Sequence, residues 1–522
     1  MRALYSHIQS IKNLQPNKIA LYFDGRGYTY HELFELTLKC ESLLLHANIS
    51  HPVRMVVMSE SAPCLIAWAL CLAKTNSTLI PVNCQLTREQ LKTVVNAADA
   101  NAVFCDEKFV KTCRAIDAKV LLTSDELEAE RSTPAEAYVD MSGADIDDFL
   151  ITFSSGSTGD PKPIMVDQAT KLARAQQTIQ LYGLTADDVV LCASPFFHSL
   201  GQRHVFVALA AGATLVYIQR FTPADWLAAV HKYQVSFVIA VSSHLQALKD
   251  DLVSNFDKLQ SLNTIVTSSA PISNELKSDL FRYLGCNFHE IYGTTEVAIV
   301  SNLYPSDADK KTATVGTICE DVEVKILRDD LSDCAQGEIG EIVVKTPLSF
   351  NGYYGKDDVY SQSLVDGFFR TGDVGKVDNE GFLSYVSRKK DIIISGGINI
   401  YPKDIEDILV TCDAIDEVSI IGVPDDFLGE VVVAVCVANN TAERALRKIA
   451  NSQLAPFQRP LKYFFASSLP LGPTGKIQKN VLREEYAPLN TDWTLPLRAL
   501  MYAESKKSND IYSVQGSKEK PY

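Results

Sequence analysis

The segment SSGSTGDPK, residues 154–162, combines hydroxyl side chains, glycines and a terminal lysine in a pattern suited to binding phosphate. Its glycines allow consecutive backbone N–H groups to point into one concavity, and its hydroxyls add donors around it. A flexible linker is the alternative, but a linker requires neither the apolar run before the segment nor a Pro-Lys pair at its end. We therefore predict a polyphosphate-binding loop. The residues expected to contact phosphate are Ser154, Ser155, Gly156, Ser157, Thr158, Gly159 and Lys162.

This loop differs from a Walker A motif, because a proline occupies position 161, where the second glycine of that motif would fall. The later segment GPTGK, residues 472–476, fails the same pattern because Ile477 follows its lysine. The sequence therefore disfavours an ordinary P-loop NTPase.

Four further segments carry side chains that can act on a phosphorylated substrate. They are PFFHSLG with His198, YGTTE with Glu296, FRTGD with Asp373, and GPTGK with Lys476. Taken singly, each has a structural explanation: a hydrogen-bonded core histidine, a surface acid, a turn residue and a solvated lysine. Taken alone, none of the four indicates a function.

Length and charge limit the possible classes of protein. A chain of 522 residues is too long for one core and predicts two to four domains. The net charge of −15 argues against a nucleic-acid-binding surface. The same charge repels anions, so an anionic substrate must be held by local cationic or hydrogen-bonding groups.

The twelve cysteines occur singly, without a Cys-x-x-Cys pair, and we expect buried thiols in a reducing compartment. No segment reaches the ~18 apolar residues of a membrane span. The first residues lack the apolar stretch of a signal peptide. We therefore expect a cytoplasmic enzyme.

Helical and strand patterns alternate through the first 300 residues. Thr29 and Glu32 form a capping-box pattern before a helical apolar face, and Thr87 with Gln90 repeats it. A helix is predicted over residues 62–74. Strands are predicted over 53–58, 79–82, 102–105, 189–193, 213–218, 237–241, 264–268 and 288–291. This alternation predicts an α/β fold with doubly wound sheets.

The pattern changes after residue 310. Residues 322–327 and 341–345 predict antiparallel strands of a small β layer, and residues 418–423, 431–437 and 462–466 predict strands of a later β/α unit. Pro402 is placed to begin a helix of that unit. We expect a large domain over residues 1–386, a hinge at 387–391, a small mobile α+β domain over 392–488, and a polar, partly disordered tail over 489–522.

Together these segments resemble the adenylate-forming superfamily, which contains acyl-CoA synthetases, adenylation domains of peptide synthetases, and luciferases. The resemblance covers residues 15–488 and rests on five motifs in order. They are SSGSTGDPK, YGTTE, TGD, SRKKDIIISGGINIYP (387–402) and PTGK. It implies that a carboxylate attacks the α-phosphorus of ATP to give acyl-AMP, and that a thiol then takes the acyl group.

The resemblance also implies roles for residues that match the motifs. Thr295 would donate to the α-phosphate, Glu296 would bind Mg²⁺, and Lys476 would stabilise charge at the reacting carboxylate. His198 would gate the acyl pocket. The remaining implied nucleotide, hinge and thiol contacts are Ala270, Pro271, Tyr292, Gly293, Thr294, Asp373, Arg388, Lys390, Gly396 and Gly397.

The residues expected to line the acyl pocket lie in 196–206, 238–244 and 290–300, and are largely Phe, Val and Ile. PFFHSLG contains no aspartate to pair a substrate ammonium, so a fatty or aryl acid is expected over an amino acid. Departures from the family pattern are Pro163, Gln168, Ser242, Ser387 and Lys479. None of them removes a group that does chemistry.

CoA is the expected thiol acceptor, with ATP and Mg²⁺ as the other small-molecule requirements. Three alternatives stay open: an enzyme that loads a carrier-protein phosphopantetheine arm, a luciferase-like oxygenase, and a non-catalytic nucleotide-binding regulator. The regulator is disfavoured because Glu296 and Lys476 are both present. Neither nucleic acid nor a membrane span is expected among the partners.

Overall fold

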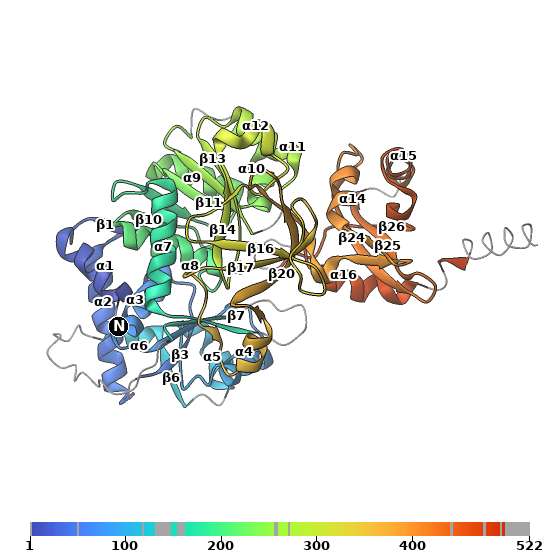
Figure 1. Cartoon of the computed structure of the whole chain (residues 1–522). Coiled ribbons are helices and arrows are strands. Elements are labelled where there is room, and N and C mark those ends of the chain that lie inside the picture. Colours follow the sequence, from blue (N-terminus) through green and yellow to red (C-terminus); the bar gives the residue numbers. More distant parts are fainter. Residues whose placement is uncertain are drawn as a thin grey trace, which may run out of the picture. The chain divides into compact units, whose positions relative to one another are not determined.

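The computed structural model describes residues 3–49, 52–116, 119–130, 148–153, 162–254, 259–269, 272–438, 442–472, 477–490 and 493–495. Their contacts divide the chain into two compact units. The first consists of Met1–Thr371 with Gly375–Tyr385, and the second of Gly372–Val374 with the chain from Val386 on. Figure 1 shows the elements of both units.

The first unit contains a nine-stranded sheet whose central strands are parallel, as the alternation in the sequence predicts. Its strands, in spatial order, are β15 (Thr317–Ile318), β14 (Ala298–Leu303), β13 (Asn287–Thr294), β12 (Thr264–Ser268), β11 (Phe237–Val241), β9 (Val189–Cys192), β10 (Thr214–Tyr217), β1 (Ile19–Phe23) and β2 (Arg26–Thr29).

A second sheet of this unit has seven strands: five pair in parallel, and the two at one edge are joined by antiparallel pairings. In spatial order they are β18 (Gly352–Tyr353), β8 (Pro163–Val166), β7 (Leu150–Phe153), β4 (Thr78–Pro81), β3 (Arg54–Met58), β5 (Ala102–Cys105) and β6 (Val120–Thr123).

Two hydrophobic cores cover the two faces of the nine-stranded sheet. Alternate strand residues enter each core: Phe237 and Ile239 join the core that contains α8, whereas Val238 joins the core that contains α9, α10 and α11. Because both faces are buried, these strands read as continuous apolar runs. The α8 core also takes in residues of the seven-stranded sheet, such as Leu79, so it joins the two sheets.

Two helices of the first unit, α2 and α4, carry complete capping boxes at Thr29 and Thr87, as the sequence predicts. The helices of this unit are α1 (Ala3–Leu14), α2 (Tyr30–His46), α3 (Ala62–Lys74), α4 (Arg88–Ala97), α5 (Val110–Arg114), α6 (Ser124–Ala129), α7 (Gln168–Tyr182), α8 (Ser199–Ala211), α9 (Pro223–Tyr233), α10 (Ser242–Ser254), α11 (Asn274–Tyr283), α12 (Ala308–Lys311) and α13 (Asp357–Gln362).

A small antiparallel layer follows, and its strands β16 and β17 pair with Glu323 opposite Lys345, which confirms the predicted antiparallel pair. The layer consists of β16 (Glu323–Leu327), β17 (Gly340–Lys345), β20 (Phe368–Val377), β19 (Leu364–Val365) and β21 (Leu383–Arg388). The fold class is therefore α/β with an added β layer.

The second unit contains a sheet of β23 (Ile398–Ile400), β22 (Ile393–Ser395), β25 (Gly429–Ala438), β24 (Ile415–Asp425) and β26 (Lys462–Ala466). Its helices are α14 (Pro402–Leu409), α15 (Glu443–Gln453) and α16 (Lys479–Tyr486). Pro402 occupies the first turn of α14, as predicted. The expected tail lies largely outside the described residues.

One local prediction was wrong, and one structural alternative does not hold. Strand β13 does not end at residue 291 but continues to Thr294, where it turns into antiparallel β14. Gly293 permits this close approach, because a Cβ there would lie 1.9 Å from the Ala298 carbonyl oxygen. Asp373, for which a turn was the structural alternative, lies inside strand β20.

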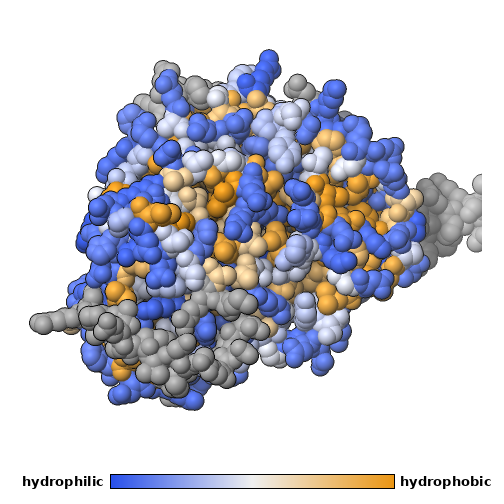
Figure 2. All heavy atoms as spheres, turned by 60° about the vertical axis from the view of Figure 1, so that its left-hand side comes forward, coloured by the Kyte–Doolittle hydropathy of each residue, from blue (hydrophilic) through white to orange (hydrophobic). Residues whose placement is uncertain are grey.

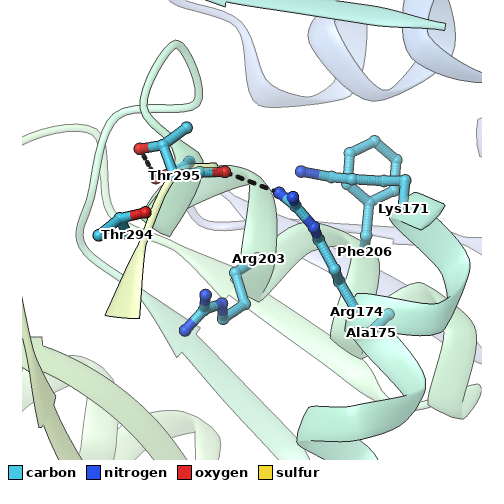
Figure 3. A pocket seen from close by; sticks show the side chains of 8 residues that line it. Lys171, Arg174, Ala175, Arg203, Phe206, Thr294 and Thr295 are labelled. Carbon is cyan, nitrogen blue, oxygen red and sulfur yellow. Dashed lines mark hydrogen bonds between the residues drawn. The ribbon is translucent and has the colours of Figure 1, made fainter. Parts of the chain in front are cut away.

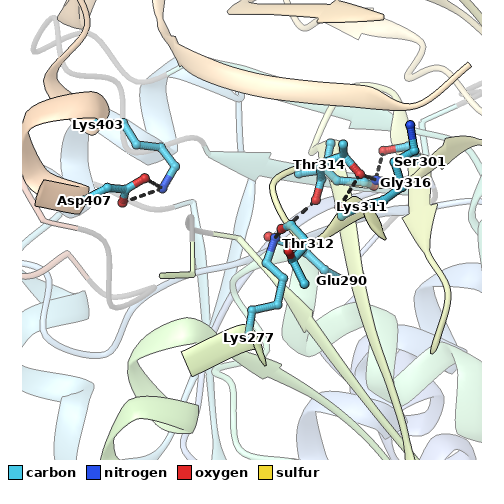
Figure 4. A network of polar contacts seen from close by, with 10 residues as sticks. Lys277, Glu290, Ser301, Lys311, Thr312, Thr314, Gly316, Lys403 and Asp407 are labelled. Carbon is cyan, nitrogen blue, oxygen red and sulfur yellow. Dashed lines mark hydrogen bonds and ion pairs between the residues drawn. The ribbon is translucent and has the colours of Figure 1, made fainter. Parts of the chain in front are cut away.

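A buried polar network joins β13 to α11 and to the segment before β15 (Figure 4). Lys277 on α11 forms an ion pair with Glu290 on β13, and it donates to the carbonyl oxygens of Thr312 and Thr314. Both side chains of the pair are almost fully buried. Because removing one partner would leave a buried charge unpaired, this network fixes β13 against the segment before β15.

All twelve cysteines are free thiols, and most of them are buried, which confirms the sequence prediction. The face in Figure 2 is a mosaic of hydrophilic atoms with hydrophobic patches between them. Among the described residues, no helix combines the length and apolar character needed to cross a membrane.

Candidate active site

The predicted phosphate loop joins two paired strands. Phe153, the last residue of β7, lies opposite Pro163, the first residue of β8, so the two ends of the loop are held side by side. Residues 154–161 lie outside the described part of the chain. Lys162 is described, and its Nζ lies 5.2 Å from the centre of the Tyr353 ring, within the range of a cation–π contact.

Tyr353 connects this lysine to the predicted metal ligand. Its hydroxyl donates to Oε1 of Glu296 at 3.3 Å. Burial, and secondarily the Glu296 carboxylate, raise the pKa of Tyr353, so the hydroxyl keeps the proton that it donates. The structure thus gathers Lys162 and Glu296, which lie far apart in the sequence, around one aromatic ring.

The turn that carries Thr295 and Glu296 is held by Arg174 from α7. The guanidinium donates to the carbonyl oxygens of Thr295 at 2.9 Å, Glu296 at 2.7 Å and Leu348 at 2.9 Å. Arg174 is only 9% exposed, and burial lowers its pKa to about 9. These three hydrogen bonds fix the backbone of the turn. Because they end on carbonyl oxygens, they do not engage the side chains of Thr295 and Glu296.

His198 is the N-cap residue of α8, and its ring packs against Phe197 with the ring centres 4.4 Å apart. The next residue, Ser199, places its Oγ 3.2 Å from Oγ1 of Thr295. Gly201 allows this start of α8 to pack closely, because a Cβ there would lie 2.2 Å from the Pro195 carbonyl oxygen. The predicted gate and the YGTTE turn are therefore neighbours.

Tyr292 is buried on β13, and its hydroxyl donates to Oγ1 of Thr371 at 3.4 Å. Gly293 and Thr294 complete this strand. Ala270 and Pro271, the other residues expected near adenine, lie outside the described residues.

Within the second unit, the structure brings Asp373 and Arg388 together. Nε of Arg388 lies 3.0 Å from Oδ1 of Asp373, whose side chain is 4% exposed. A carboxylate has about four acceptor positions on its two oxygens, enough to accept from the two hydroxyls of a ribose. The pair fits the predicted contact with a ribose.

The other predicted residues of the second unit are exposed or undescribed. Lys390 lies in a 3₁₀ turn directly after β21. Gly396 and Gly397 form the turn between β22 and β23 at φ +57° and +80°, a region that favours glycine. Lys476 falls outside the described residues, so its predicted role is not tested here.

Two buried cations near the turn were missed at the sequence level. Lys171 and Arg174 are 6% and 9% exposed, and they lie on the buried face of α7 with Gln168 and Thr178. These polar residues recur at helical spacing, so they form one stripe along the helix. They were missed because a polar stripe on a helix normally faces solvent. Figure 3 shows both cations and Arg203 of α8 around a small cavity beside Thr295.

The residues present fit a magnesium ion held with the phosphates of a nucleotide. Within the described segments there is no group of three or more His, Cys, Asp or Glu side chains able to hold a metal by itself. Mg²⁺ in phosphate-transfer sites is commonly held by one or two carboxylates and by the phosphates themselves. Glu296, with its Tyr353 donor, supplies one such carboxylate.

Comparison with known proteins gives the class of the chain. A family model described as AMP-binding enzyme matches residues 9–354, and one described as AMP-binding enzyme C-terminal domain matches residues 404–476. An indoleacetate–CoA ligase of Aromatoleum aromaticum is 30% identical over 90% of this chain and 96% of its own length. A 2-succinylbenzoate–CoA ligase of Listeria monocytogenes is 28% identical over 92% and 99%.

Two solved structures share the fold. ATP-bound MatB from Rhodopseudomonas palustris superposes with a TM-score of 0.85 at 26% identity, covering 94% of this chain and 99% of its own. The o-succinylbenzoate CoA synthetase of Bacillus subtilis, in complex with an acyl-adenylate, gives 0.83 at 26% identity, covering 91% and 97%. The chain belongs to the AMP-binding enzyme family and is an enzyme of the acyl-CoA synthetase type.

Proposed function

We propose that this enzyme activates a fatty or aryl carboxylic acid with ATP and transfers the acyl group to CoA. The observation that carries the proposal is the cluster of Lys162, Thr295 and Glu296, gathered by the β7–β8 and β13–β14 hairpins in a chain of this family. An ammonium, a hydroxyl and a carboxylate in one place suit a nucleoside triphosphate and its cation.

In the first step a carboxylate oxygen of the acid attacks the α-phosphorus of ATP, the bond to the β-phosphate breaks, and pyrophosphate leaves. Lys162 would contact the leaving phosphates and Thr295 the α-phosphate. When bound at Glu296, Mg²⁺ would supply charge neutralisation of the phosphates. Asp373 would accept from the ribose hydroxyls, and Arg388 would keep that carboxylate oriented.

In the second step the thiolate of CoA attacks the acyl carbon, the mixed-anhydride bond breaks, and AMP leaves. Gly396 and Gly397 form an exposed turn with no side chain to obstruct it, which suits close approach of a pantetheine arm. We assign Lys476 to the first step and these glycines to the second. Rotation at a hinge over residues 387–391, about Lys390, would present Lys476 to the reacting groups in the first step and the two glycines in the second.

The test is acid-dependent release of pyrophosphate over a panel of fatty, aryl and α-amino acids, with and without CoA. The proposal predicts release with fatty or aryl acids, because an ammonium group would lose water near His198 without gaining an anionic partner. It also predicts AMP and an acyl-CoA when CoA is present. An α-amino acid as best substrate, or light emission in place of a thioester, would contradict it.

The phosphopantetheine arm of a carrier protein presents the same thiol as CoA. The two acceptors are separated by supplying free CoA alone, since a carrier-loading enzyme would release pyrophosphate but form no acyl-CoA.

A further inference from the structure

The buried face of α7 carries positive charge. Lys171 and Arg174 point inward with Gln168 and Thr178, although burial of an ammonium or guanidinium removes it from water at a considerable free-energy penalty. Arg203, one helix away on α8, faces the same place. Burial and the mutual repulsion of these cations lower the pKa of Lys171.

These side chains surround a cavity of about 20 Å³ in the first unit. Its lining includes Lys171, Arg174, Arg203, Ser199 and Thr295, so it adjoins the residue assigned to the α-phosphate of ATP. In Figure 3 the cations come from two helices, and the threonines lie across the cavity from Arg174. A water site needs about 10–15 Å³ by this kind of measure, so the cavity has room for one or two oxygen atoms.

The three cations differ in what they already bind. The Arg174 guanidinium already donates hydrogen bonds to three carbonyl oxygens. Lys171 donates to Oε1 of Gln202 at 2.9 Å and lies over the Phe206 ring. Arg203 has no hydrogen-bond or ion-pair partner in the part of the chain that the structure describes.

No aspartate or glutamate among the described residues lines the cavity. A nearby donor also lacks a partner within those segments. The Tyr182 hydroxyl is buried without a hydrogen bond, and the charge of Arg203 acts on this residue. An apolar group in the cavity would leave Arg203 without a hydrogen-bond acceptor, which is costly where water is excluded.

We propose that the acid substrate carries a second, unreactive carboxylate, and that Arg203, with Lys171, binds it in this cavity. The proposal rests on the proposed function, because the cavity borders Thr295, the residue that this function assigns to the α-phosphate of ATP. A carboxylate supplies the missing acceptor and the missing negative charge, through charge-assisted hydrogen bonds. The local cations also overcome the repulsion that a net charge of −15 exerts on a dianion.

The test compares α,ω-dicarboxylic acids of increasing length with monocarboxylic acids of the same length, and cinnamate with 4-carboxycinnamate. The readout is kcat/KM for pyrophosphate release. The wild type should prefer the diacid of at least one pair, since a monoacid leaves Arg203 unpaired. Arg203→Met should reduce that preference roughly 10- to 100-fold, the value of a hydrogen bond to a charged group.

Two control variants test whether the lost preference is specific to Arg203. Arg203→Lys keeps the charge and should retain much of the preference. Arg282→Met removes an exposed arginine on α11 and should leave the preference unchanged. Thermal unfolding of each variant shows that the fold is intact.

Several outcomes would overturn the proposal. One is a higher kcat/KM for the monoacid in every pair. Another is an equal loss of kcat/KM for the diacid and the monoacid in Arg203→Met. Stimulation of monoacid turnover by chloride, abolished in Arg203→Met, would assign the cavity to an inorganic anion instead. Absence of pyrophosphate release with every acid would contradict the proposed function itself, and the inference with it.

Discussion

Arg174 gives the sharpest test of how the active-site turn is held. Replacing it with Met removes three hydrogen bonds of 2.7–2.9 Å to the carbonyl oxygens of Thr295, Glu296 and Leu348. Hydrogen bonds to a charged group contribute about 1.5–3 kcal/mol each. Removing a buried guanidinium also relieves a desolvation penalty of several kcal/mol. The difference predicts a net loss of about 1–4 kcal/mol in stability.

The larger effect is expected in function, because the freed turn carries Glu296. The assay is a Mg²⁺ titration of acid-dependent pyrophosphate release in wild type and Arg174→Met, with thermal unfolding measured alongside. We expect weaker apparent affinity for Mg²⁺ and a lower rate. Arg328→Met is the control, because Arg328 binds Glu338, Ser332 and Asp333 on the surface, where water compensates for their loss.

Normal Mg²⁺ dependence and normal stability in Arg174→Met would refute this reasoning. They would show that the turn holds its shape without the guanidinium. Equal effects of Arg174→Met and Arg328→Met would show that loss of any arginine acts non-specifically.

Further predictions concern the metal ligand, the two half-reactions and pH. Glu296→Gln should lower turnover and weaken the apparent affinity for Mg²⁺, and an unchanged Mg²⁺ titration would place the metal elsewhere. Lys476→Ala should slow adenylate formation about 10²–10³-fold but spare thioester formation from supplied acyl-AMP. Gly397→Leu should do the reverse, and equal loss of both steps in both variants would contradict the division of labour. Burial lowers the pKa of His204 and of His289 to about 4, so the folded state keeps both neutral while the unfolded state binds protons below about pH 6.5. Stability should therefore fall as pH drops from about 6.5 towards 4, and a flat denaturation profile over that range would contradict it.

Much of the fold follows from local sequence patterns. Helix α3 begins at Ala62 and ends at Lys74 as predicted, because its apolar run is bounded by a capping serine and a polar turn. Strands β11 and β12 also have their predicted limits. The residues of β11 are apolar on both faces because each face meets a separate core.

The errors arise where long-range contacts override local signals. Strand β13 continues through Gly293 because β14 pairs with it, and a pairing partner that lies later in the chain leaves no local trace. The glycine and threonines there indicate a turn on their own. Asp373 likewise follows a glycine at φ +69°, yet lies within β20.

The residues of the candidate site likewise divide into those that a local motif identifies and those that only the structure shows. Thr295 and Glu296 could be named from a motif, but Tyr353 could not, because an aromatic residue in a short edge strand has many structural uses. Lys171 and Arg174 were missed since polar helical stripes usually face water. Their regular spacing with Thr178 was the available signal, and only burial shows which way the stripe points.

The central claim is that a carboxylate oxygen attacks the α-phosphorus of ATP before a thiol takes the acyl group. Supplying an acid labelled with oxygen-18 in its carboxylate, together with ATP and CoA, tests this directly by mass spectrometry of the nucleotide product. The account predicts AMP that contains one labelled oxygen and a thioester that retains the other. Unlabelled AMP, or label in orthophosphate together with ADP, would contradict it.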